Sequence, residues 1–119
     1  IEQKKIRQNN ANKKKALTFY KVIEKIGSKY AWLELKPATG RTHQLRIHCA
    51  KLGNPIVGDR KYKSSEDKNS QDLPYSFKKL FLHARSVTFV HPISKKTTKI
   101  EAPLPKHIGL VWKHFGWKI

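Results

Sequence analysis

The sequence predicts an α+β fold, with a mainly antiparallel mixed sheet, a short helix after the second strand and a C-terminal helix. Three observations support this prediction. Stretches rich in β-branched and aromatic residues lie at 17–26 and 30–35, and further strand-like stretches follow later in the chain. Apolar residues recur at helical spacing over 43–52 and again beyond Pro105. The length of 119 residues suits a single domain.

The first two predicted strands form a hairpin. The segments 17–26 and 30–35 are separated only by Gly27-Ser28-Lys29, which has the length of a tight turn. Residues 1–15 combine lysine, arginine and asparagine with very little apolar content. We therefore expect 1–15 to be a basic flexible arm, and 16–119 to be the folded part of the chain.

The predicted helix spans residues 43–52. Thr42 is placed to cap its first turn, and Gly53 can supply the left-handed conformation that ends a helix. A loop is expected at 54–62. Residues 63–75 are rich in Ser, Asn, Asp and Lys, which is typical of an exposed insertion.

Two strands and a helix are predicted for the rest of the chain. The strands are expected at 80–91 and 97–102, joined by a turn at 92–96. A closing helix across a face of the sheet is expected after Pro105. Its apolar residues at helical spacing are Ile108, Val111, Trp112 and Phe115.

The charge of the chain indicates an anionic partner. Lysine and arginine number 26 against 8 acidic residues, which gives a formal net charge of +18. RNA or DNA is favoured, because neutralised phosphates release condensed counterions. No apolar stretch approaches the roughly 18 residues of a membrane-spanning helix, and the single cysteine, Cys49, excludes an intrachain disulfide. We therefore expect a cytoplasmic protein without metal. The first residue is Ile1 and the chain has no methionine, so a fragment or processed product is expected.

Arginine is concentrated in one part of the chain. Three of the five arginines, Arg41, Arg46 and Arg60, lie within residues 41–60, where only one lysine occurs. Arginine offers a planar fork for carboxylate or phosphate, whereas lysine acts as a point charge. Arg41 lies near a predicted helix start, which favours an anion, and His43 and Arg46 share a helix face. This pattern predicts a cationic site for a phosphate or a carboxylate.

The motifs around these arginines resemble a known family. The segments ALTFYKVIE, LELKPATGRTHQLRIHCAKLGNPIVGDRKY and LHARSVTFVHPISKKTTKIEAPLP are similar to the C-terminal part of the catalytic domain of RluA-family pseudouridine synthases. The resemblance runs from about Ala16 to about Pro105. It implies isomerisation of a flipped uridine in ribosomal or transfer RNA by a catalytic aspartate, with no cofactor. Arg46 would then pair with this aspartate and keep it ionised.

The predicted site is incomplete within these residues. None of the eight acids has the HRLD-like context of the family's aspartate, and Asp59, in the GDxxY-like loop, is expected to be structural. The chain alone is therefore expected to be inactive. Its expected partners are RNA, the N-terminal half of the parent enzyme and, through exposed apolar surface, further copies of itself. The residues predicted to contact RNA are Arg41, Thr42, His43, Gln44, Arg60, Lys61, His83 and Arg85.

Other interpretations remain open. The chain could be a non-catalytic basic RNA-binding module associated with ribosomes, or an anion-binding structural domain of a larger assembly. Capping and helix-surface positions also explain Thr42 and Gln44, and hydrogen-bonding or structural roles are favoured for the histidines. Cys49 is interpreted as an inert buried thiol.

Overall fold

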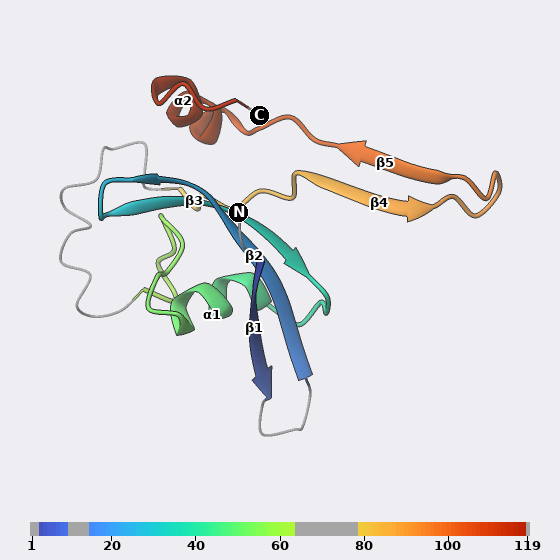
Figure 1. Cartoon of the computed structure of the whole chain (residues 1–119), viewed down its shortest axis with the longest axis horizontal. Helices are drawn as coiled ribbons and strands as arrows, with labels where there is room; N and C mark the ends of the chain where they lie inside the picture. Colours follow the sequence, from blue (N-terminus) through green and yellow to red (C-terminus); the bar gives the residue numbers. More distant parts are fainter. Residues whose placement is uncertain (1–2, 10–14, 64–78, 119) are drawn as a thin grey trace. The chain divides into compact units, whose positions relative to one another are not determined.

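The computed structural model describes residues 3–9, 15–63 and 79–118, and these form an α+β fold as predicted (Figure 1). The strands of the described residues form two antiparallel sheets, one of three strands and one of two, where the sequence had suggested one mixed sheet. The chain divides into two compact units. The first comprises residues 1–56 and 60–67, and the second comprises residues 57–59 and 68–119.

The first unit is built on an antiparallel sheet of order β1-β2-β3. Its strands are β1 (Gln3–Asn9), β2 (Lys15–Ile26) and β3 (Tyr30–Pro37). The predicted hairpin of β2 and β3 is confirmed, and Gly27 takes a φ of 55° in its turn. That left-handed conformation is one that glycine adopts without steric cost. The register shifts between Val22 and Glu24, where β2 contains a bulge.

Strand β1 corrects one prediction. A flexible arm was expected over residues 1–15, but Gln3–Asn9 pairs with β2 along its whole length. The pairing satisfies backbone groups along an edge of β2 that would otherwise be exposed. Ile6, the inward-facing apolar residue of β1, lies opposite Thr18 and is only 5% exposed. One well-placed side chain and the backbone hydrogen bonds therefore order a strand whose composition is polar.

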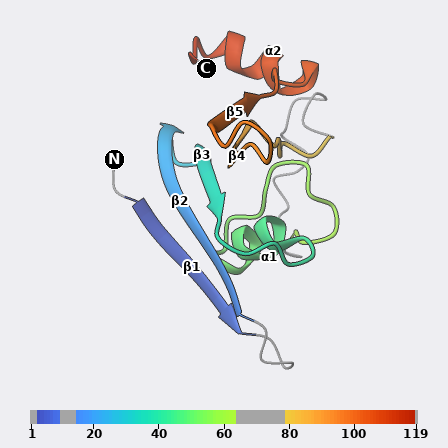
Figure 2. The same ribbon diagram turned by 90° about the vertical axis from the view of Figure 1, so that its right-hand side faces the viewer.

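Helix α1 (Gln44–Lys51) lies against the sheet of the first unit (Figure 2). It agrees with the predicted span to within one residue at each end. Its N-cap is His43 rather than Thr42, and no side chain caps it. After the C-cap, Gly53 adopts a φ of 85° and donates its N–H to Ala50 O, as expected for a helix stop. The buried residues between helix and sheet are Ile6, Ala16, Thr18, Gln44, His48 and Cys49.

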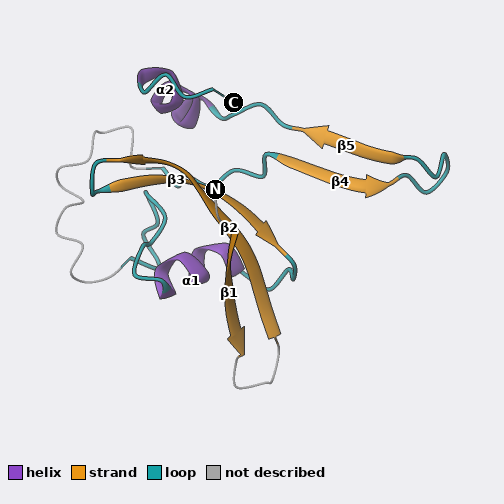
Figure 3. Cartoon of the chain, in the orientation of Figure 1, coloured by secondary structure: helices purple, strands orange, loops and turns teal. Residues whose placement is uncertain are grey.

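The second unit contains a two-stranded hairpin and a helix. Strands β4 (Ser86–Val90) and β5 (Thr97–Glu101) pair in antiparallel fashion (Figure 3). The turn at 92–96 is confirmed, and His91 N donates to Lys96 O at 2.9 Å. The predicted strand at 80–91 is wrong at its start, because residues 80–85 are irregular. There Phe81 N bonds Val57 O, a loop partner rather than a strand.

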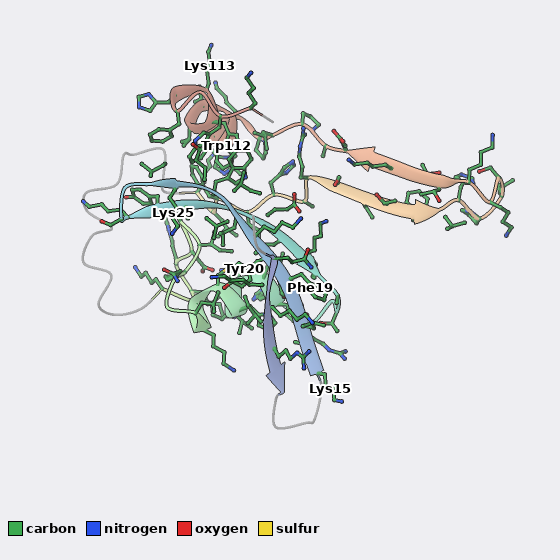
Figure 4. All side chains as sticks on the ribbon, in the orientation of Figure 1. Lys15, Phe19, Tyr20, Lys25, Trp112 and Lys113 are labelled. Carbon is green, nitrogen blue, oxygen red and sulfur yellow. The ribbon has the colours of Figure 1, made fainter. Side chains whose placement is uncertain are left out.

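Helix α2 (Lys106–His114) confirms the predicted C-terminal helix. Pro105 is its N-cap, and Figure 4 labels Trp112 and Lys113 on it. Its expected place across a face of the sheet remains a prediction. The predicted insertion at 63–75 lies outside the described residues except for Lys63. Within the described part of the chain, no helix has the length and apolarity to cross a membrane.

Candidate active site around Arg46

The segment that carries Arg41 to Arg46 is fixed to β2 by the buried side chain of Gln44. Its Nε2 donates to Leu17 O at 3.0 Å and to the Thr18 hydroxyl at 2.9 Å. Its Oε1 accepts from Arg41 N at 3.1 Å and from the Thr39 hydroxyl at 2.6 Å. Because Leu17 O can only accept and Arg41 N can only donate, the amide has one possible orientation. Gln44 therefore locks the start of α1 onto the sheet.

A second buried residue continues this hydrogen-bond network. The Thr18 hydroxyl lies 2.8 Å from Nδ1 of His48, which is 1% exposed. Burial, and to a lesser extent the charge of Lys51, lowers the pKa of His48 from its ordinary value of 6.5. His48 is therefore neutral at pH 7, because its charged form would lose hydration without gaining an anionic partner. Its role in this unit is to hold α1 against β2.

Arg46 lies over the ring of Tyr62, in a small cluster of aromatic and basic side chains. Its guanidinium carbon is 5.0 Å from the ring centroid of Tyr62, a cation–π contact. His43 hydrogen-bonds the same tyrosine, with Nδ1 2.8 Å from the hydroxyl, and meets its ring edge-on. Lys61 places a second cation 5.4 Å from that ring. Residues that the sequence separates by up to 19 positions thus form one cationic cluster.

The structure places the other predicted residues in different ways. Arg41 is exposed and its Nε donates to Lys15 O at 3.0 Å, which links the guanidinium to the start of β2. Arg60 and Thr42 are exposed. Gln44 is 5% exposed and its amide bonds groups of the chain, so its predicted contact with RNA stays a prediction that its burial does not favour.

The remaining two predicted residues belong to the second unit. His83 Nε2 lies 3.1 Å from Ala102 O, and Arg85 bonds the same carbonyl oxygen. Arg85 also lies 3.8 Å from Glu101, whose other oxygen meets Lys99 at 3.0 Å. The hydrogen bond and charge of Lys99, with the charge of Arg85, lower the pKa of Glu101. These contacts hold the base of the β4–β5 hairpin, and the predicted contacts of His83 and Arg85 with RNA stay predictions.

Tyr62 is the site residue that sequence reasoning missed. In the sequence, Tyr62 is the last position of the GDxxY-like loop. The available signal was the presence of two candidate cations, Arg60 and Lys61, beside an aromatic residue. Among the described residues, no three His, Cys, Asp or Glu side chains are grouped so as to hold a metal ion. The chemistry that this cluster offers is cationic: it can bind a phosphate, or pair with a carboxylate and keep it ionised.

Comparisons with known proteins identify similar sequences and a similar fold. Residues 2–51 match the family described as RNA pseudouridylate synthase. The ribosomal large subunit pseudouridine synthase C of Rickettsia conorii is 41% identical over 82% of this chain, which spans 30% of that relative's length. The tRNA pseudouridine synthase C of Vibrio vulnificus is 33% identical over 98% of this chain and 54% of the relative.

A solved structure of an RNA pseudouridylate synthase domain is also similar to this chain. The human RNA pseudouridylate synthase domain containing 1 matches 87% of this chain and 49% of its own, with a TM-score of 0.65 and 28% identity. This similarity confirms the predicted α+β fold. Family motifs, sequence relatives and fold together identify the chain as a relative of the RNA pseudouridine synthases.

Proposed function

We propose that this chain supplies the arginine side of a pseudouridine synthase active site that acts on ribosomal or transfer RNA in the cytoplasm. The observation that carries the proposal is the position of Arg46, in the GRTHQLR motif, with its guanidinium on the face of Tyr62. In this proposal Arg46 pairs with a catalytic aspartate and favours its ionised form. The formal charge of +18 supports a phosphate-rich substrate.

None of the acids of the described residues has the HRLD-like context of the family's catalytic aspartate. Asp59 is the aspartate among them, and it is 5% exposed, in the GDxxY-like loop. Glu34 is exposed and pairs with Lys36 at 3.5 Å, and Glu101 pairs with Lys99. In the proposal the aspartate therefore comes from polypeptide outside this sequence. The chain's coverage of 30% of the Rickettsia relative is compatible with this.

The reaction can be followed by a hydrogen that it releases. Isomerisation breaks the bond from uracil N1 to ribose C1′ and forms a bond from C5 to C1′. The C5 hydrogen then leaves to solvent and N1 takes up a proton, so the product is an isomer of uridine. We expect protein expressed from the complete reading frame to release tritium from RNA that carries [5-³H]uridine. No release from any structured ribosomal or transfer RNA would contradict the proposal.

A non-catalytic RNA-binding module is the second candidate. It is favoured by the exposed cations of the first sheet, such as Lys4, Lys5 and Arg7 on β1. It predicts RNA binding that weakens steeply with salt, without tritium release. Gel-shift titrations at 50 and 200 mM salt, run beside the tritium assay, separate the two candidates.

A further inference from the structure

We propose that Tyr62 and His43 form a positioning unit for Arg46, a role that rests on the proposed function and that none of the family motifs assigns. The Tyr62 side chain links the other two residues. His43 Nδ1 meets the Tyr62 hydroxyl at 2.8 Å, and the Tyr62 ring meets the Arg46 guanidinium at 5.0 Å. In this proposal His43 holds the Tyr62 side chain through its hydroxyl, and the Tyr62 ring in turn orients the Arg46 guanidinium.

The backbone of His43 supports this assignment. His43 is one of two described non-glycine residues with a positive φ, at 51°, and it stands at the N-cap of α1. This conformation costs a side-chain-bearing residue about 1–2 kcal/mol. No cap hydrogen bond from the His43 side chain offsets that cost. The imidazole instead bonds the Tyr62 hydroxyl, as is typical of strained residues at functional sites.

The geometry of the contact suits an arginine that must pair with an anion. An arginine side chain loses much rotamer freedom when it is held in one place. Stacking on an aromatic face restricts it without using its N–H groups, which point outward in the guanidinium plane. Tyr62 can therefore pre-orient Arg46 while its donors serve a carboxylate. Lys61, on the same ring at 5.4 Å, adds positive charge beside the site.

The fold keeps this unit in place from two directions. Gln44, next to His43, fastens the start of α1 to Leu17 and Thr18 of β2. The Tyr62 side chain is half-buried, so its ring is partly held by surrounding atoms. Arg46 is half-buried in the same way, one turn into α1. A substitution at Tyr62 should therefore change the orientation of the Arg46 side chain while α1 stays folded against the sheet.

The test uses variants of the protein from the complete reading frame. We expect Tyr62→Leu to lower the single-turnover rate at saturating RNA about tenfold, which is within the range for a half-buried cation–π contact, with little change in the RNA dissociation constant. Tyr62→Phe keeps the ring but loses the hydrogen bond to His43, so it should restore part of that rate. His43→Ala removes the same hydrogen bond and leaves the ring, so its rate should be close to that of Tyr62→Phe.

The matched control is a second ring–cation pair. Phe19 of β2, labelled in Figure 4, lies 5.5 Å from Lys5 Nζ in the same unit and does not contact Arg46 in the contacts described above. Phe19→Leu removes an equivalent contact, so it reports the effect of lost packing alone. A rate loss from Phe19→Leu as large as that from Tyr62→Leu would overturn the inference.

A double-mutant cycle tests whether Tyr62 acts through Arg46. In an Arg46→Lys background, which keeps the charge but loses the planar fork, Tyr62→Leu should lower the rate less than about twofold further. Fully additive losses would overturn the inference while the proposed function stands. An inactive wild-type protein would overturn both.

If the Tyr62→Leu protein folds poorly, an NMR measurement on other variants still tests the inference. In the NMR spectrum of the wild-type chain, the Arg46 Nε–H resonance should carry a ring-current shift from Tyr62. His43→Ala and Tyr62→Phe both remove the hydrogen bond that holds the ring, so both should reduce that shift by similar amounts. An unchanged Arg46 shift in His43→Ala would contradict the role of His43.

Discussion

The hydroxyl of Thr18 lies 2.8 Å from Nδ1 of His48, and both side chains are almost fully buried between β2 and α1. Thr18 also accepts a hydrogen bond from Gln44 Nε2. Burial, and to a lesser extent the charge of Lys51, lowers the pKa of His48 and so favours its neutral form. The interface between helix and sheet therefore contains a histidine whose burial opposes protonation.

The stability of the chain should therefore fall in mild acid. Because the pKa of His48 is lowered in the folded state, the unfolded chain binds a proton first as the pH falls below 6.5. The His48 contribution is fully present above pH 6.5 and is lost as the pH falls toward the lower folded-state pKa, by at most about 1.4 kcal/mol per pH unit. Urea unfolding at pH 7.5 and at several lower pH values measures this slope.

Two variants isolate the histidine in that experiment. His48→Gln removes the titrating group and should flatten the slope relative to wild type. Lys51→Gln removes the charge that assists the shift, so it should reduce the slope partly. Identical slopes in wild type and His48→Gln would show that His48 titrates normally in the folded chain.

Loss of the Gln44 amide should destabilise the first unit strongly. Gln44→Leu removes one partner from the buried Thr18 hydroxyl, and one each from Leu17 O and Arg41 N, whose hydrogen bonds to Gln44 are part-buried. We expect a loss of about 2–4 kcal/mol in the free energy of unfolding. Gln3→Leu, at an exposed position of β1, is the matched control and should change stability by less than about 0.5 kcal/mol. Comparable small effects for both variants would contradict the buried network.

Glycine is required at residue 58 for two reasons, and at residue 53 for one. Both residues have a positive φ, 82° at Gly58 and 85° at Gly53. A Cβ at Gly58 would also overlap the backbone carbonyl of Lys79, whereas a Cβ at Gly53 would meet no atom. Gly53→Ala should cost about 1 kcal/mol of stability, and Gly58→Ala clearly more. Thermal unfolding of the pair tests this, and equal melting temperatures would argue against the close approach.

The β4–β5 hairpin exposes an apolar face that should support self-association. Val87 and Ile100 are cross-strand partners and are 56% and 54% exposed. We expect the isolated chain to associate at high concentration, and more so at high salt, because salt screens the repulsion of the +18 charge. Sedimentation velocity of wild type and of Val87→Thr/Ile100→Thr measures this. A monomer at every salt concentration would contradict the prediction.

Local patterns predicted the elements whose signals are short-range. The hairpin at Gly27, the stop at Gly53 and the span of α1 all follow from turn chemistry and apolar spacing. β1 could not be predicted in this way, because its stability comes from pairing with β2 and from one buried side chain, Ile6. Thr42 failed as a cap because His43 turns the chain left-handed before the helix begins.

Only part of the site could be predicted, because some of its contacts join residues that are distant in the sequence. Arg46 could be predicted from the GRTHQLR motif and from the concentration of arginine, in place of lysine, within residues 41–60. Its contact with Tyr62 depends on the conformation of the loop after α1, and the spacing of apolar residues does not predict that conformation. Gln44 had the residue type of a substrate contact, and only its burial shows that its amide is used inside the chain.

The most direct test of the central claim is the separate measurement of catalysis and RNA binding in Arg46→Ala. In the protein from the complete reading frame, we expect the single-turnover rate of tritium release to fall on the order of 100-fold. The RNA dissociation constant should change little, whereas a Lys4→Ala/Lys5→Ala variant should weaken binding and leave the rate at saturating RNA nearly unchanged. Equal losses of rate and affinity in Arg46→Ala would contradict the role assigned to Arg46.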